Sequence, residues 1–126
     1  MTLWAAAKAN DVAELERLLA EGAEIDAKDP RGYSPLMLAA YSGSEAALDF
    51  LLARGADPSS ADPGGNTVLM GAAFKGYASM VEKLLAAGAD PHAKSGTGLD
   101  AAGFAQMFGQ HEIVLLLGRV TTRSVQ

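Results

Sequence analysis

The feature that most constrains this chain is a segment that occurs twice in succession. Residues 29–61 align with residues 62–94 without a gap, at a spacing of 33 residues. Both copies contain an opening Asp-Pro, a Leu-Met pair, an Ala-Ala pair, a Leu-Leu pair and a closing Gly-Ala-Asp-Pro. A fixed period of this length indicates stacked units, each of which needs a neighbour to cover its apolar face.

The same period extends beyond the two copies in both directions. The residues that the two copies share are called the framework. Residues 1–28 keep this framework in a unit that lacks its turn, and residues 95–118 keep part of it in a degenerate last unit. We therefore predict one domain over residues 1–118, with an N-terminal capping unit (1–28), two full units (29–61 and 62–94) and a C-terminal capping unit (95–118). Gly118 is expected to end the last helix, which leaves residues 119–126 as a frayed tail anchored only by Val120.

Each unit carries the signals of two helices. Equivalent positions of successive units are called a column here. One column contains Ser34, Thr67 and Asp100, which are good N-cap residues. Pro35 follows Ser34 at the first helical position, where a missing N–H costs nothing. In the first unit, Asp11 and Glu14 have the spacing of a capping box for a helix that ends near Ala20. Two further columns predict left-handed residues, one between the helices and one after the second helix: Asn10, Gly43, Gly76 and Gly109, then Gly22, Gly55 and Gly88.

These offsets resemble the ankyrin repeat, whose hallmark is Thr-Pro-Leu-His-x-Ala. The two copies have Ser34-Pro35-Leu36-Met37-Leu38-Ala39 and Thr67-Val68-Leu69-Met70-Gly71-Ala72 at this place. Met replaces the hallmark His in both copies, and Val68 replaces the Pro in the second. The resemblance implies an all-α solenoid of stacked helix-turn-helix units with projecting β-turn or hairpin tips.

Composition and charge exclude several classes of function. The net charge of −5 argues against nucleic acid as a partner, because nucleic-acid affinity rests mainly on neutralising phosphates. The chain has no cysteine, which excludes disulfides and thiolate chemistry. No apolar run approaches the roughly 18 residues of a membrane span. The first residues lack the basic segment of a signal peptide, so we expect a cytoplasmic protein, or a periplasmic or secreted one if a signal peptide has been removed.

No set of residues predicts catalysis, a cofactor or a metal site. His92 and His111 are the two histidines, and neither has the spacing of a zinc motif. The Gly64-Gly65 turn lacks the lysine and hydroxyl of a phosphate-binding loop. Aspartates such as Asp29 and Asp62 recur at the repeat spacing, which is typical of turn residues. We therefore expect a protein that is not an enzyme.

The resemblance implies that a partner is bound by the turn tips and by the exposed face of each first helix, which together line a concave groove. Four of the seven Tyr and Phe residues fall in these columns. They form either a protein-binding patch, which we favour, or an outer rim of the core. The candidate partner-binding residues are Lys8, Arg31, Tyr33, Tyr41, Ser42, Asn66, Phe74, Lys75, Leu99, Met107 and Phe108.

Charge is expected to differ between the two sides of the stack. Carboxylates fall on the second helices, whereas lysines and an arginine are the charges in the groove columns. The groove is therefore predicted to be apolar to mildly basic, and to fit a segment with apolar and acidic groups. Gly71 adds a gap, because its column holds Leu38 and Phe104 in the neighbouring units. Either Phe104 leans into this gap, which we favour, or a partner side chain enters it.

These observations predict a non-enzymatic protein-binding module that is a monomer when free. It would dock its concave groove on a single partner protein and mask, inhibit or protect it. The chain also resembles small stand-alone ankyrin proteins of bacteria, which implies a co-expressed bacterial enzyme as the partner. The alternative is an adaptor or scaffold subunit with a second binding surface. A small-ligand binder or enzyme would need a deep pocket with convergent polar groups, for which the sequence offers no counterpart.

Overall fold

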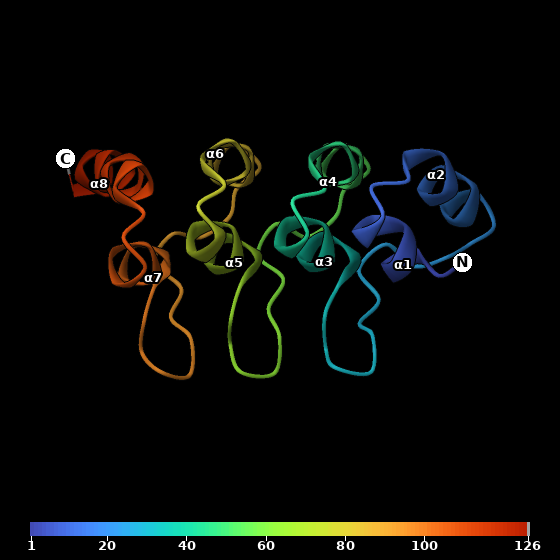
Figure 1. The fold of residues 1–126 in the computed structure, drawn as a ribbon, viewed down its shortest axis with the longest axis horizontal. Helices are drawn as coiled ribbons and strands as arrows, with labels where there is room; N and C mark the ends of the chain where they lie inside the picture. Colours follow the sequence, from blue (N-terminus) through green and yellow to red (C-terminus); the bar gives the residue numbers. More distant parts are fainter. Residues whose placement is uncertain (126) are drawn as a thin grey trace.

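A computed structural model describes the backbone of residues 1–125 and the side chains of residues 1–118. The predicted all-α solenoid is confirmed: in this part of the chain eight helices lie in two rows (Figure 1). One row contains the first helix of each pair, and the other contains the second. The helices are α1 (Leu3–Lys8), α2 (Val12–Ala20), α3 (Pro35–Tyr41), α4 (Glu45–Ala53), α5 (Val68–Lys75), α6 (Ala78–Ala86), α7 (Ala101–Met107) and α8 (His111–Val125).

The predicted N-caps are confirmed. The side chains of Ser34 and Thr67 each accept a hydrogen bond of 3.2 Å from the backbone N–H three residues later, and Asp100 accepts one of 2.8 Å from Gly103. The predicted left-handed columns are also confirmed, because every glycine in them has a positive φ. Asn10 has a φ of 59°, a conformation that few residues other than Gly and Asn adopt readily. These residues set the start of each first helix and the turns on either side of each second helix.

The core lies between the two rows of helices. Buried leucines of the second helices meet buried residues of the first helices, and paired alanines at Ala39-Ala40 and Ala72-Ala73 allow close packing between neighbouring units. No unit is covered on its own, as expected for a stacked architecture. The larger core side chains with almost no exposure are Leu15, Leu36, Met37, Leu48, Leu51, Val68, Leu69, Met80, Val81, Leu84, Ile113 and Leu117.

Hydrogen bonds connect neighbouring units although the hallmark His is absent. Asn10 Oδ1 accepts a bond of 2.8 Å from the N–H of Ala47, in the first turn of α4, and Ser44 Oγ donates one of 2.9 Å to the carbonyl of Lys8. Ser44 makes no side-chain cap of its own helix, so Asn10 of the preceding unit supplies that acceptor. Met70, at the His position, instead accepts a bond of 3.3 Å from the Thr67 N–H within its own unit.

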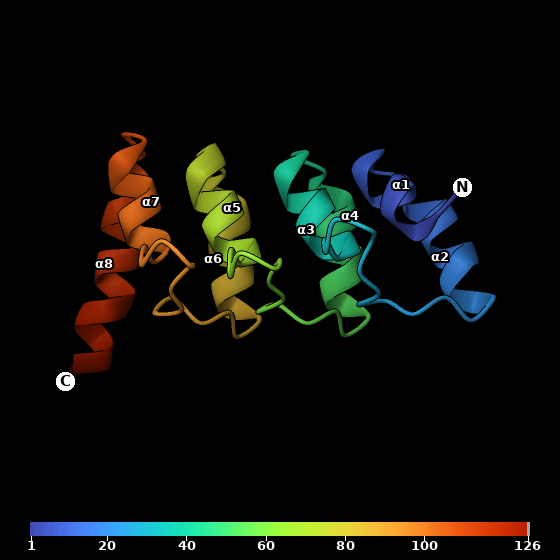
Figure 2. The ribbon, with the colours of Figure 1, turned by 90° about the horizontal axis from the view of Figure 1, so that it is seen from below.

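The turn tips are residues 29–33, 62–66 and 95–99. They project below the row of first helices in Figure 1, and Figure 2 shows them from below, in front of the helix pairs. Asp29 Oδ1 accepts bonds of 2.9 Å from the N–H groups of Arg31 and Tyr33, and Asp62 does the same for Gly64 and Asn66. The recurring aspartates thus have the turn role that their spacing predicted.

Two local predictions are wrong. The helix does not end at Gly118, because α8 continues to Val125. A glycine ends a helix when it turns left-handed, and Gly118 is not among the glycines with positive φ. The proposed anchor Val120 lies outside the residues whose side chains are described. The second correction concerns Glu14: its backbone N–H donates to Asp11 as predicted, at 3.1 Å, but its carboxylate pairs with Arg17 Nε rather than closing a capping box.

Candidate partner-binding groove

A pocket opens between the second tip and the first helices of the central units. Its volume is about 300 Å³. Residues from α3, α5, α7 and the tip that precedes α5 line it: Tyr41, Asn66, Met70, Gly71, Phe74, Lys75 and Phe104. Because most of these side chains are apolar, the pocket is a candidate binding site for apolar groups.

Tyr41 lies across α5 at the position where Gly71 has no side chain. A Cβ atom on Gly71 would lie 1.7 Å from Tyr41 Cε1 and 2.5 Å from Cδ1, far closer than atoms can approach. The expectation that Phe104 fills this gap is therefore wrong. The ring comes from the preceding unit, and Phe104 lines the pocket beside it. Gly71 is thus a place of close approach rather than a vacancy.

Aromatic contacts extend from the pocket in two directions. On one side, the Tyr41 ring meets the Tyr33 ring edge-on with centroids 5.8 Å apart, and the Arg31 guanidinium lies 5.0 Å from the centroid of Tyr33. On the other side, Phe74 meets Phe108 edge-on with centroids 4.4 Å apart. The pocket therefore lies in the middle of a row of rings that crosses three units.

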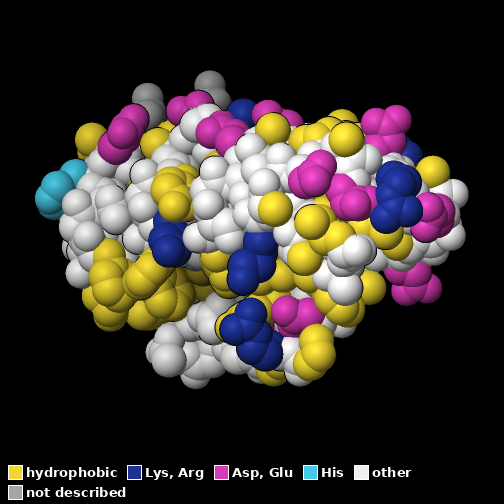
Figure 3. Space-filling view, turned by 45° about the vertical axis from the view of Figure 1, so that its right-hand side comes forward, with side chains coloured by type: hydrophobic (Ala, Val, Ile, Leu, Met, Phe, Trp, Pro, Cys, Tyr) yellow, Lys and Arg dark blue, Asp and Glu magenta, His cyan; other side chains and the backbone are white. Residues whose placement is uncertain are grey.

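The rings differ in how much of their surface faces solvent. Phe74 is 41% exposed, Phe108 48% and Met107 62%. Tyr41 is half-buried, and this burial, with smaller contributions from Asp62 and Tyr33, raises the pKa of its hydroxyl. Tyr41 thus serves mainly as a wall of the pocket, whereas the other three side chains present apolar surface to solvent. Figure 3 shows hydrophobic side chains gathered at the lower left of the face in view, beside Lys and Arg side chains.

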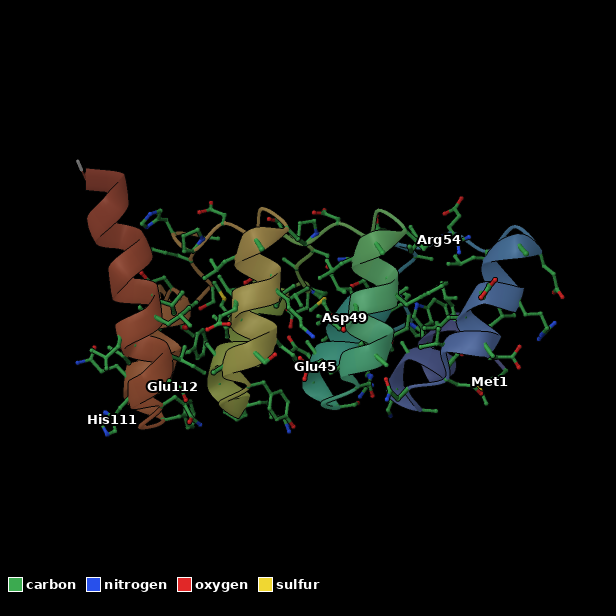
Figure 4. The ribbon with its side chains drawn as sticks, turned by 90° about the horizontal axis from the view of Figure 1, so that it is seen from above. Met1, Glu45, Asp49, Arg54, His111 and Glu112 are labelled. Atoms are coloured by element: carbon green, nitrogen blue, oxygen red, sulfur yellow. The ribbon has the colours of Figure 1, made fainter. Side chains whose placement is uncertain are left out.

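Carboxylates gather on the side of the second helices as predicted, but Asp62 of the second tip also lies close enough to the groove to act on the Tyr41 hydroxyl. On the side of the second helices, Lys83 Nζ pairs with Glu45 at 2.7 Å and with Asp49 at 3.0 Å. The pKa of Glu45 is lowered by its hydrogen bonds to Lys83 and Ser79. Figure 4 shows Glu45, Asp49 and Glu112 on this outer side. In the groove, by contrast, Lys8 and Lys75 are exposed and make no ion pair with any residue of the described part.

The structure brings together some of the candidate residues and not others. Tyr41, Asn66, Phe74 and Lys75 line one pocket. Three more join it through ring contacts, namely Arg31, Tyr33 and Phe108. Four candidates lie outside this set: Lys8 and Ser42 at the ends of α1 and α3, Leu99 against α7, and Met107 at the end of α7.

Met70, Gly71 and Phe104 were not among the candidates although they line the pocket. Met70 is 3% exposed and occupies the hallmark His position, so the pattern marked it as framework. Gly71 and Phe104 share a column whose members face the neighbouring unit. The missing side chain at Gly71 was the signal for a pocket there, but entry of a partner side chain was the less favoured of the two predicted alternatives.

Within the described residues, a metal-binding group or a membrane-spanning helix would suggest another function. No three His, Asp or Glu side chains there lie in a group that could hold a metal ion. The helices of the same part are too short or too polar to cross a bilayer. His92 and His111 are both exposed to solvent.

Comparison with known proteins agrees with the fold. A family model described as ankyrin repeats, in three copies, matches residues 3–95. Proteins of this family generally act through protein–protein interaction and are generally non-enzymatic. None of the curated proteins compared with the chain matches it. Because the family model covers more than half of the sequence, the chain belongs to the ankyrin-repeat family.

Proposed function

We propose that this protein is a binding module that docks its concave groove on one partner protein and so masks, inhibits or protects it. The observation that carries the proposal is the exposed pair of rings of Phe74 and Phe108, which are in contact next to an apolar pocket. Apolar side chains that cluster on a surface without covering one another fully are typical of interaction sites. The free chain is proposed to be a monomer whose groove is open to solvent.

The geometry supports a protein rather than a small molecule as the partner. The row of rings runs from the Tyr33 tip to the end of α7, well beyond a pocket of about 300 Å³. A groove of three or four repeats offers on the order of 800 Å² to a partner, which is the usual size of a specific interface. A co-expressed bacterial enzyme is the partner class that we propose, with occupancy of its surface as the mode of action.

The adaptor alternative requires a second binding surface. On the outer side, Leu115 is 69% exposed, but the neighbouring second helices carry carboxylates and the ion pairs of Lys83. A single exposed leucine is normal for a protein surface. We therefore favour one binding surface over two.

Capture from a lysate of the source organism tests the proposal. The wild type, the Phe74→Ala/Phe108→Ala variant and a Leu115→Ala control would each be immobilised, and bound proteins identified by mass spectrometry. We expect one protein to be retained by the wild type and by the control, and to be lost from the double variant with its helical circular dichroism intact. If the double variant retains that protein, or if Leu115→Ala loses it, the groove is not the binding surface.

Activity measurements would then separate masking from protection. If the captured protein is an enzyme, its activity and its thermal inactivation would be followed with increasing amounts of the ankyrin protein. Loss of activity at one equivalent indicates inhibition, and a longer half-life at full activity indicates protection.

A further inference from the structure

The pocket beside Gly71 has a composition that specifies more than a general apolar contact. Its walls are the rings of Tyr41, Phe74 and Phe104 and the side chain of Met70, and the Tyr41 ring lies in contact with the Gly71 backbone. Among the described residues that line it, the polar side chains besides the hydroxyl of Tyr41 are those of Asn66 and Lys75. Such a site favours one apolar group and orients it by a small number of polar contacts.

The size of the pocket fits a single large side chain. A cavity of about 150 Å³ is enough to hold a benzene molecule. The pocket here has about 300 Å³ and is open to solvent, so an aromatic ring, or a leucine or methionine side chain, can enter with part of its backbone. Aromatic and methionine side chains also match the walls, because rings and thioethers pack favourably against aromatic edges.

The polar groups of the pocket define the charge of its occupant. The Asp62 carboxylate lies beside Asn66, but it already accepts bonds from the N–H groups of Gly64 and Asn66 and from the Asn66 amide. Lys75 is exposed at the end of α5 and forms no ion pair within the described residues, whereas Lys83 on the outer side is held between two carboxylates. The amide nitrogen of Asn66 is directed to Asp62, at 3.3 and 3.2 Å from its two carboxylate oxygens, which leaves the amide oxygen as an acceptor. A carboxylate next to the apolar group would pair with Lys75, and a backbone N–H could donate to Asn66.

We propose that this pocket is the anchor site for a partner segment in which an aromatic, leucine or methionine side chain stands beside an aspartate or glutamate. This proposal rests on the proposed function and names the chemistry that the groove selects. The apolar side chain enters between Tyr41 and Phe74, and the carboxylate pairs with Lys75. The remaining apolar surface of Phe108 and Met107 is then covered by the neighbouring residues of the segment.

A peptide selection tests this chemistry without knowledge of the natural partner. A phage library of random 12-residue peptides would be selected on the wild-type protein, and enriched peptides would be synthesised with their acidic residue either kept or replaced by lysine. We expect enriched sequences to contain an apolar residue adjacent to Asp or Glu. The wild type should bind the acidic form on the order of tenfold more tightly than the lysine form, because a like-charge contact replaces an attractive one.

Charge reversal in the protein gives the decisive comparison. Lys75→Glu should reverse the preference, so that the lysine form of the peptide binds more tightly than the acidic form. Arg54→Glu is the matched control, because it makes the same change in net charge at the end of α4 on the outer side (Figure 4). It should keep the wild-type preference, since the screening length of about 8 Å limits the effect of a distant charge.

Several results would overturn the proposal. These are an unchanged preference in Lys75→Glu, an equal change in Arg54→Glu, the absence of any enriched peptide, and enriched peptides without the apolar and acidic pair. Equal or tighter binding of 3-phenylpropionate, a small aromatic carboxylate, would show that a small molecule rather than a protein segment is the occupant. The proposed function fails by a different result, namely retention of the natural partner by Phe74→Ala/Phe108→Ala.

Discussion

The contact between Tyr41 and Gly71 predicts that the same substitution has opposite effects in two backgrounds. In an exposed helix interior, replacing Gly by Ala stabilises by about 1 kcal/mol, because Gly loses more backbone freedom on folding. In this protein the new Cβ would lie 1.7 Å from Tyr41 Cε1. The Tyr41 ring must therefore move away from α5 in Gly71→Ala.

The cost of this movement follows from what the ring contacts. Loss of the edge-on pair with Tyr33, whose centroids are 5.8 Å apart, costs about 0.5–1.5 kcal/mol. Re-exposure of a third of the ring, roughly 60 Å² of apolar surface, costs about 1.5 kcal/mol. Against a propensity gain of about 1 kcal/mol, Gly71→Ala should lower the free energy of unfolding by about 1–2 kcal/mol. In a Tyr41→Ala background, where the ring is absent, it should raise the free energy of unfolding by up to about 1 kcal/mol.

Urea denaturation at 25 °C, followed by circular dichroism, measures these free energies for the wild type, both single variants and the double variant. The expected coupling between the two positions is about 2–3 kcal/mol, at the upper end of the range for residues in contact. Gly118→Ala is the control, because a Cβ there meets no described atom within 4 Å and the substitution should stabilise. If Gly71→Ala stabilises the wild type as much as it stabilises Tyr41→Ala, the ring does not lie where the structure places it.

Three further predictions concern single interactions. Because burial raises the pKa of Tyr41 above its ordinary value of 10.0, the stability that its neutral hydroxyl contributes is complete below pH 10 and is lost as the pH rises through the raised pKa. Unfolding of wild type and Tyr41→Phe between pH 8 and 11 should therefore show the wild type losing stability relative to the variant, and parallel curves would contradict the assignment. Asn10→Gly should lower the free energy of unfolding by about 1 kcal/mol, because the hydrogen bond to Ala47 is lost. Asn10→Ala should lower it by about 1–2 kcal/mol more, because alanine does not readily adopt the left-handed φ of 59°. Thermal melts of the two variants can check this order. Lys83→Met should lower the free energy of unfolding by less than about 1 kcal/mol in low salt, since its partners Glu45 and Asp49 lie on an exposed surface. In 1 M NaCl the substitution should have almost no effect, because salt screens exposed charges.

The repeat alone was sufficient to predict the architecture. Residues such as Ser34, Thr67 and Gly55 act through their own backbone or the next few residues, so their helix caps and turns could be predicted without knowledge of the tertiary structure. The gathering of carboxylates on the side of the second helices also followed from the columns, because the repeat fixes which side each column faces. The end of α8 could not be predicted in this way, since a glycine is compatible with both a helix and its termination.

The candidate site shows the limit of the same reasoning. The columns indicated Tyr41, Phe74 and Lys75 as groove residues, but they did not indicate that Tyr41 crosses to Gly71 of the next unit or that Met70 and Phe104 complete the pocket. A sequence determines which helix face a residue occupies, because that depends on local periodicity. Whether a ring on that face covers its neighbour or projects into solvent depends on side-chain packing between units, and only the tertiary structure decides this.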